Sequence, residues 1–142
     1  MEYGYCQIGY PVLDKNGYTD PSTENRWMIS PNFMFASRVS SSTDKVDFWA
    51  AVSRCKNYSE TDTNGVTYNG WRMPTYAEML LLDILQNVSK SEIKEITDRH
   101  RYWTADPASN SAFRILNPSG GTNGENASYA EVRCVRDIDR PL

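Results

Sequence analysis

Apolar residues between Asp44 and Cys55 recur with the spacing of an α-helix. One face of this segment collects positions i, i+3, i+4 and i+7, namely Phe48, Ala51, Val52 and Cys55. The pattern predicts a helix that begins at Asp44 and turns Cys55 inward in its last turn. Asp44 and Asp47 would lie in the first turn, where negative charge suits the positive end of the helix dipole.

A second helix is predicted after residue 74. Thr75 and Glu78 form a Thr-x-x-Glu capping box, in which each side chain satisfies a backbone N–H that the helix start leaves unpaired. Pro74 keeps the preceding loop from continuing into the helix. The expected buried stripe of this helix consists of Ala77, Leu80, Leu81, Ile84 and Val88.

Short strand patterns lie before the first helix and after the second. They cover residues 27–29, 33–35, 101–104 and 112–116. A last strand is predicted at residues 129–135, where alternation puts Val132 and Cys134 on one face and Arg133 on the other. Hydrophilic stretches without periodicity separate the elements, above all 59–69 and 117–128. The order of strands, two helices and more strands predicts a segregated α+β fold.

Composition restricts the class of protein. A chain of 142 residues with 39% hydrophobic and 12% aromatic residues is neither disordered nor collagen-like, and it suits one domain. The net charge is −3 and Lys and Arg are scattered, which argues against a nucleic-acid partner. No apolar run is long enough for membrane insertion of this segment. The first residues do not resemble a signal peptide, so the chain is either cytosolic or the mature or excised part of a longer exported chain. We expect the second, because the chain opens abruptly in mixed polar and aromatic residues.

Metal chemistry finds little support in the sequence. The three cysteines (Cys6, Cys55 and Cys134) form no CxxC pair, and His100 is the one histidine, so a structural zinc site is not expected. Residues 14–20 resemble a calcium loop in part. Their glycine stands one place early, and Asn25 occupies the position of the bidentate Glu, so a turn is the preferred interpretation.

Four motifs in order resemble a known family. They are Phe48 or Trp49 through Ala51 to Cys55; Gly70–Thr75 with Glu78 and Leu80; Tyr102–Thr104; and Val132–Asp137. Together they resemble the family of exported bacterial domains named for the Fibrobacter succinogenes major paralogous domain, which is similar to the C-terminal domain of the Legionella collagen-like adhesin. The resemblance covers residues 44–137.

The resemblance implies a C-type-lectin-like fold, related to the formylglycine-generating enzymes, with two helices packed on a small twisted antiparallel sheet with long loops. Residues 26–142 would form this domain, and residues 1–25 an N-terminal extension or its start. The motif residues expected to hold the scaffold are Trp71, Arg72, Pro74, Thr75, Glu78, Tyr102, Trp103, Arg133 and Arg136. Trp71 would pack under the second helix start, and Arg72 would hold loop carbonyls or a carboxylate.

The same resemblance brings Cys55 and Cys134 together in a disulfide. Such a bond would place the protein in an oxidising, extracellular or cell-surface compartment. Cys6 is then left over, either as an ordinary thiol or as the partner of a cysteine upstream. The related enzymes use paired cysteines near the C-terminus, where this chain has Cys134 alone, so we expect no enzymatic activity.

Members of the family are typically surface, fimbrial or adhesin-type proteins, often from gut Bacteroidetes. The expected ligand-binding face is formed by long loops that carry Asp106, Asn110, Arg114, Asn117, Asn123, Glu125, Asn126 and Tyr129. The expected function is recognition of a glycan or protein at a cell surface. The chain lacks the Glu-Pro-Asn or Gln-Pro-Asp triplet and the Trp-Asn-Asp triplet of calcium-dependent lectins, so no cofactor is expected, although Glu125 and Asn126 are possible calcium ligands.

Three alternatives stay open. The chain could be a purely structural module of a longer surface protein. It could be a ligand-binding protein diversified by a retroelement, since such proteins share this fold. An enzyme of the formylglycine-generating type ranks last.

Overall fold

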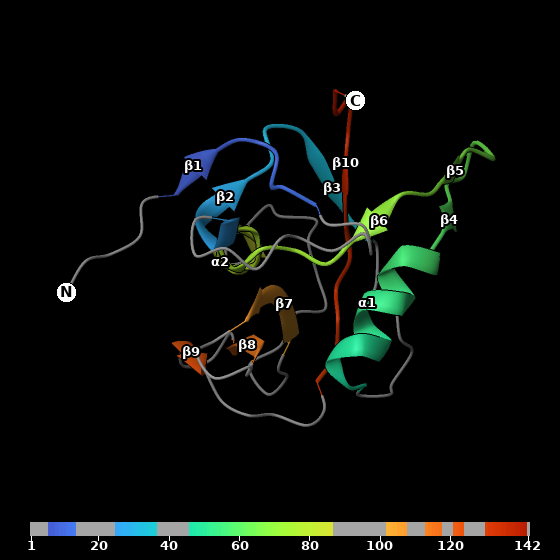
Figure 1. The fold of residues 1–142 in the computed structure, drawn as a ribbon. Coiled ribbons are helices and arrows are strands. Elements are labelled where there is room, and N and C mark those ends of the chain that lie inside the picture. Colours follow the sequence, from blue (N-terminus) through green and yellow to red (C-terminus); the bar gives the residue numbers. More distant parts are fainter. Residues whose placement is uncertain are drawn as a thin grey trace.

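The computed structural model describes residues 6–13, 25–36, 46–86, 102–107, 113–117, 121–123 and 130–141. In these residues the chain forms two helices and four small sheets, an α+β arrangement (Figure 1). The helices are α1 (Phe48–Asn57) and α2 (Tyr76–Gln86). Neither helix is long and apolar enough to cross a membrane.

A three-stranded antiparallel sheet lies between the helices. Its strands are β3 (Phe33–Phe35), β10 (Val135–Asp137) and β6 (Trp71–Arg72), with β10 in the centre. The register sets Arg136 opposite both Met34 and Trp71, and Val135 opposite Phe35 and Arg72. Because side chains alternate along a strand, Trp71 and Arg72 point to opposite faces of this sheet.

Each face of the sheet meets its own apolar cluster. The larger cluster contains Trp71 and the buried stripe of α1, together with Trp103 and the disulfide cysteines. The smaller cluster is formed by Tyr76, Met79 and Leu82 of α2 with Tyr102, and Phe35 packs against it. The sheet therefore stands between the two cores, and its side chains contribute to both.

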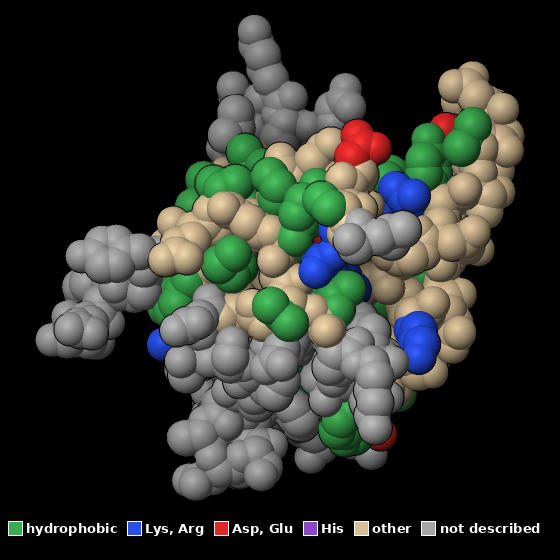
Figure 2. All heavy atoms as spheres, turned by 45° about the horizontal axis from the view of Figure 1, so that its top comes forward, with side chains coloured by type: hydrophobic (Ala, Val, Ile, Leu, Met, Phe, Trp, Pro, Cys, Tyr) green, Lys and Arg blue, Asp and Glu red, His purple; other side chains and the backbone are tan. Residues whose placement is uncertain are grey.

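The remaining strands form three further sheets. One sheet contains the antiparallel strands β7 (Tyr102–Pro107), β8 (Phe113–Asn117) and β9 (Gly121–Asn123). The strands β1 (Gln7–Ile8) and β2 (Met28–Ile29) pair in parallel, and a 3₁₀ turn (Asn25–Trp27) precedes β2. The strands β4 (Glu60–Thr61) and β5 (Thr67–Tyr68) form a hairpin that projects from the body of the molecule (Figures 1 and 2).

Helix α1 has the predicted buried face but a later start. Its buried residues are Phe48, Ala51, Val52 and Cys55, as the spacing indicated. The predicted start at Asp44 is wrong, because Val46 pairs with Ala130 in a β-bridge and cannot be helical. The helix begins at Phe48. Asp47 is its N-cap residue, and its carboxylate accepts a hydrogen bond from Ala50 N at 2.7 Å.

The buried stripe of α2 differs from the prediction. Ile84 is 63% exposed, and Leu80 and Leu81 are only half-buried, whereas Met79 and Leu82 are fully buried. Relative to the prediction, the helix is rotated about its axis. Its inward face includes Glu78, a charged residue that a search for apolar positions leaves out. Ala77 is buried as predicted, and Val88 lies outside the described residues.

The last strand also differs. It comprises Val135–Asp137 instead of residues 129–135, and residues 130–135 are buried without exception. Arg133 was predicted on the face opposite the buried cysteine, yet it is 3% exposed and its Nε donates to the Ala36 carbonyl at 2.6 Å. Other parts of the chain therefore cover this segment on both sides, so that Arg133 is buried as well as Val132 and Cys134. Similarly, Trp27 belongs to the 3₁₀ turn, so the strand predicted there begins at Met28.

Candidate functional site

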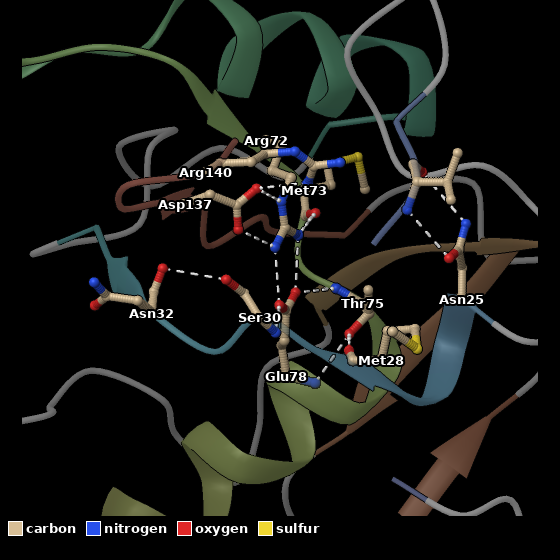
Figure 3. A network of polar contacts seen from close by, with 11 residues as sticks. Asn25, Met28, Ser30, Asn32, Arg72, Met73, Thr75, Glu78, Asp137 and Arg140 are labelled. Atoms are coloured by element: carbon tan, nitrogen blue, oxygen red, sulfur yellow. Dashed lines mark hydrogen bonds and ion pairs between the residues drawn. The ribbon is translucent and has the colours of Figure 1, made fainter. Parts of the chain in front are cut away.

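Arg72 is the centre of a buried polar network between β6, β10 and α2 (Figure 3). Its Nη1 and Nη2 donate to the two carboxylate oxygens of Glu78, each at 2.8 Å. Its Nε and Nη2 donate to Asp137 at 3.1 and 2.9 Å, and Nη1 also donates to the Met73 carbonyl at 3.0 Å. All five N–H groups of the guanidinium are thereby used, two bidentate pairs included.

Glu78 connects this network to the start of α2. Its Oε1 accepts from Thr75 N at 2.9 Å, and Thr75 Oγ1 accepts from Glu78 N at 3.1 Å, so the predicted capping box is present. Glu78 Oε2 also accepts from Ser30 N, and the Thr75 hydroxyl donates to the Met28 carbonyl at 2.7 Å. One buried carboxylate therefore holds together a helix start, a strand and the segment that follows β2.

Asp137 carries the network to the C-terminal end of the chain. Its Oδ2 also accepts from Arg140 Nη1 at 3.1 Å. Burial raises the pKa of the Asp137 carboxyl, but hydrogen bonds and attraction from Arg72, with further bonds to Ser30 and Arg140, bring this pKa below its ordinary value. Burial likewise opposes the charge of Arg72, but the neighbouring carboxylates raise its pKa above the usual range.

The ion network joins the strands β6 and β10 to the helix α2. The donors of Arg72 bind Glu78, Asp137 and the Met73 carbonyl, and the oxygens of Glu78 bind Arg72 and backbone N–H groups. The side chains of Arg72 and Glu78 are 2% and 0% exposed. The expectation that Arg72 holds carbonyls or a carboxylate is therefore confirmed, and it holds both. Asp137 as a partner of Arg72, and Ser30 as a partner of Glu78, were not predicted from the sequence. Asp137 directly follows the Val-Arg-Cys-Val-Arg motif, and that position was the available signal.

The other scaffold residues lie on both sides of the central sheet. Trp71 contacts Tyr58, after α1, at a ring distance of 5.3 Å, and its Nε1 donates to the Tyr68 carbonyl. It therefore packs on the α1 side, and its predicted place under the α2 start is wrong. Trp103 Nε1 donates to the Val46 carbonyl, and the Pro74 carbonyl accepts from the N–H of Ala105. Tyr102 is fully buried beside α2.

Arg136 lies at the molecular surface beside the β4–β5 hairpin. Its Nε donates to the Asn69 carbonyl, and its guanidinium stands 5.4 Å from the centre of the Tyr68 ring. The Tyr68 hydroxyl in turn donates to Asp62 Oδ2 at 3.0 Å. From the sequence, residues 59–69 were expected to be a hydrophilic stretch without periodicity, and no strand was predicted there. The Asn64–Gly65 pair within it is a typical hairpin turn signal that would have identified this element.

The expected disulfide joins Cys55 and Cys134. The S–S distance is 2.06 Å, and both residues are fully buried. The bond connects the last turn of α1 to the segment that enters β10, across a sequence separation of 79 residues. Cys6 is a free, exposed thiol.

Four of the eight expected ligand-binding residues lie within the described part of the chain. Asp106, Arg114, Asn117 and Asn123 lie on the strands β7, β8 and β9, and their side chains lie outside what the structure describes. The pairing of Pro107 with Phe113 brings the backbone of Asp106 near that of Arg114. Asn123 stands opposite Ile115. The other four residues lie outside the described ranges: Asn110, Glu125, Asn126 and Tyr129.

Metal-binding groups are not assembled in the described part of the chain. No cluster of three or more His, Cys, Asp or Glu side chains there could hold an ion. Asn25 exchanges two hydrogen bonds with the backbone of Val12, which uses its amide. The calcium-like residues 14–20 and His100 lie outside the described ranges.

Sequence comparison connects the chain to a fimbrial protein. No family model matches it. The chain is similar to the major fimbrium tip subunit FimD of Porphyromonas gingivalis, with 27% identity over 152 aligned positions, and a second FimD sequence from this species matches equally well. The alignment covers 91% of this chain and 22% of FimD. The chain therefore spans about a fifth of the length of the relatives it matches.

Proposed function

We propose that this chain is a non-catalytic, C-type-lectin-like domain of a fimbria-associated protein outside the cell, and that it recognises a glycan or a protein through its long-loop face. The observation that carries the proposal is the similarity to a fimbrium tip subunit along 91% of the chain. Because that subunit is several times longer, the similarity supports a role for one domain within a larger surface protein.

The buried disulfide supports a location outside the reducing cytoplasm. Cys55 and Cys134 are fully buried at the junction of α1 and the segment leading into β10. Disulfides of this structural kind persist in oxidising compartments and are rare in cytosolic proteins. A surface protein exposed to the medium also benefits from a cross-link that survives partial unfolding.

A role in binding, without catalysis, agrees with the chemistry of the buried polar groups. All five donors of Arg72 are hydrogen-bonded to Glu78, Asp137 or the Met73 carbonyl. A catalytic cation would keep at least one donor for the reacting group. This network joins the strand β6 to the helix α2 and so provides a rigid frame.

The proposed recognition face is the sheet β7–β8–β9 with its connecting loops. The Pro74 carbonyl, one residue before the Thr75 cap, accepts from Ala105 N of β7, so the frame and this sheet are directly joined. The loops are rich in Asn, Ser and Gly, residues that make adaptable polar contacts at low entropic cost. Binding residues on loops held by a rigid scaffold are a common arrangement in proteins.

The test is binding of the purified domain to a glycan array and to an array of extracellular matrix proteins, first with calcium and then with EDTA. We expect saturable binding on one of the arrays. Loss of that binding in EDTA would identify a calcium-dependent lectin, and retention would identify direct recognition by the loops. No binding on either array would contradict the recognition role.

A matched pair of triple variants locates the binding face. Asn123→Ala, Glu125→Ala and Asn126→Ala together should abolish binding. Ser53→Ala, Lys56→Ala and Asn57→Ala together, on the exposed side of α1, should leave it unchanged. The proposed face is wrong if the two triple variants bind with equal affinity.

A second candidate function is that of a purely structural module in a longer surface protein. The ion network and the disulfide favour it, since both serve cohesion. A structural module would lose stability in urea when the ion network or the disulfide is removed, and it would bind nothing on either array.

A further inference from the structure

Two Asn–Gly dipeptides lie five residues apart in the sequence, one in the turn of the projecting hairpin and one directly after its second strand. Asn64 and Gly65 form part of the hairpin turn, and Asn69 and Gly70 connect β5 to β6. All four residues are exposed. Asn–Gly is the dipeptide most prone to spontaneous deamidation, because a glycine leaves its own backbone nitrogen unhindered for attack on the preceding side-chain amide. The two sites differ in the charges that surround them.

The peptide group between Asn69 and Gly70 faces a cation. Its carbonyl oxygen, that of Asn69, accepts a hydrogen bond from Arg136 Nε. In the part of the chain that the structure describes, neither the Gly70 N–H nor the Asn69 side chain has a hydrogen-bond partner. A Cβ placed on Gly70 would meet nothing within 4 Å, so this stretch of backbone is open to solvent.

The peptide group between Asn64 and Gly65 lies beside an anion. The Gly65 N–H donates to the Asp62 carbonyl at 3.0 Å, so the nitrogen that would have to attack is already bound. Asp62 Oδ1 accepts from the N–H groups of Asn64 and Val66, each at 2.9 Å. The bond from Val66 N–H, with those from Tyr68 and Asn64, lowers the pKa of Asp62, so its carboxylate stays charged at neutral pH.

We propose that Asn69 is a site of spontaneous modification in the folded protein, converted to aspartate and isoaspartate with assistance from Arg136, while Asn64 is protected. A base removes the Gly70 amide proton, and the nitrogen attacks the side-chain carbon of Asn69. The bond to the side-chain nitrogen breaks, and ammonia leaves with the proton. Water then opens the resulting succinimide ring at either carbonyl, which yields the two acids.

Arg136 assists at the first step of this sequence. Loss of the Gly70 proton places negative charge on the peptide group, largely on the Asn69 carbonyl oxygen. The guanidinium that hydrogen-bonds this oxygen stabilises the charge as a fixed donor does in an oxyanion hole. At Asn64 the same charge would develop beside the Asp62 carboxylate, which opposes it, and the Gly65 hydrogen bond would be lost.

The modification would change the junction between the hairpin and the core. An isoaspartate adds one methylene to the backbone between β5 and β6. That junction is closed by the bond from Trp71 Nε1 to the Tyr68 carbonyl at 2.9 Å, so a longer backbone would loosen the hairpin from the central sheet. The new carboxylate would also stand beside Arg136.

The experiment compares the two asparagines within one peptide. The folded protein is incubated at mildly alkaline pH, then digested with trypsin under conditions that preserve amides, and a zero-time sample corrects for the digestion itself. Cleavage after Lys56 and Arg72 yields a peptide with both sites, and electron-transfer fragmentation assigns each acid and identifies isoaspartate. We expect acid to accumulate at Asn69 several-fold faster than at Asn64, and at similar rates when urea unfolds the chain.

Variants separate the assistance of Arg136 from simple exposure. Arg136→Gln should slow the reaction at Asn69 several-fold without altering Asn64, whereas Arg136→Lys should retain part of the effect. Circular dichroism and the urea midpoint establish that each variant is folded, and Asn69→Gln supplies the unreactive control. Equal rates at the two sites in the folded protein, or an Asn69 rate unaffected by Arg136→Gln, would overturn the proposal.

Discussion

Arg72 is the last residue of β6, and its buried side chain binds Glu78 of α2. Burial of a charge is costly unless opposite charges and hydrogen bonds compensate it. Here the compensation is complete on the arginine side, because Glu78 and Asp137 both bind it in a bidentate way. An apolar replacement would leave Glu78, with 0% exposure, without its counter-charge. The arginine therefore determines geometry, since its planar donors admit one arrangement of three elements.

Replacement of Arg72 by Met should lower the free energy of unfolding by about 3–5 kcal/mol, because two buried carboxylates lose their partner. Urea unfolding measures the loss. The matched control is Arg54→Met on α1, which belongs to no ion pair in the network and should cost much less. Equal losses for Arg72→Met and Arg54→Met would contradict this account.

Asp137 should make the protein sensitive to acid. Its pKa lies below the ordinary value of 3.8 in the folded state, so the stabilisation is present above the unfolded pKa and is lost as pH falls through the folded one. Urea midpoints measured from neutral pH downward should decline less steeply below about pH 4 in Asp137→Asn than in the wild type. Asp139→Asn, at an exposed position, should leave the slope unchanged.

At the scale of elements, the two helices differ in how far their sequence predicts them. The inward face of α1 is entirely apolar, so its period of 3.6 residues identifies Phe48, Ala51, Val52 and Cys55. The inward face of α2 has Glu78 at its centre, and apolar periodicity cannot assign a charged residue to the core. The capping box was nevertheless predictable, because its chemistry is local to Thr75 and Glu78. Asp137, a distant partner in sequence, was not.

The two helix caps should differ in their contribution to stability. Asp47→Ala removes one exposed bond to Ala50 N and should cost about 1 kcal/mol. Thr75→Ala removes a buried cap and leaves the Met28 carbonyl without its donor, so we expect roughly 2–3 kcal/mol. Thr75→Ser, which keeps the hydroxyl, should recover most of the loss. Thermal and urea unfolding of the three variants would test this order, and equal costs for Asp47→Ala and Thr75→Ala would contradict it.

At the scale of the molecule, the sequence predicts the class of fold better than its layout. The order of strands and helices indicated α+β, and the structure agrees. The central place of β10 was not predictable, since it pairs with β3 and β6 from distant parts of the chain. The cysteine pairing followed from a family resemblance and not from spacing. For the proposed ligand-binding face, the sequence identifies residue types, but their arrangement depends on contacts between loops.

The disulfide should contribute a large part of the stability. A cross-link across 79 residues is worth about 4.5 kcal/mol on the chain-entropy model, and measured effects are often smaller. The double variant Cys55→Ala and Cys134→Ala should lower the urea midpoint substantially. Cys6→Ser, at an exposed free thiol, should leave the midpoint unchanged. Equal midpoints for the wild type and the double variant would show that the bond adds no net stability.

The same cross-link has a mechanical consequence. When shear flow pulls on a surface protein, tension runs along the chain by the shortest covalent path, which here passes through the sulfur atoms of Cys55 and Cys134. The residues between them bear no load even if they unfold. Roughly 280 Å of contour length is thereby withheld from extension, at about 3.5 Å per residue. Helix α2 and the sheet β7–β8–β9 both lie inside this closed loop. The backbone of the proposed binding face would therefore carry no tension while the segments outside the loop are stretched.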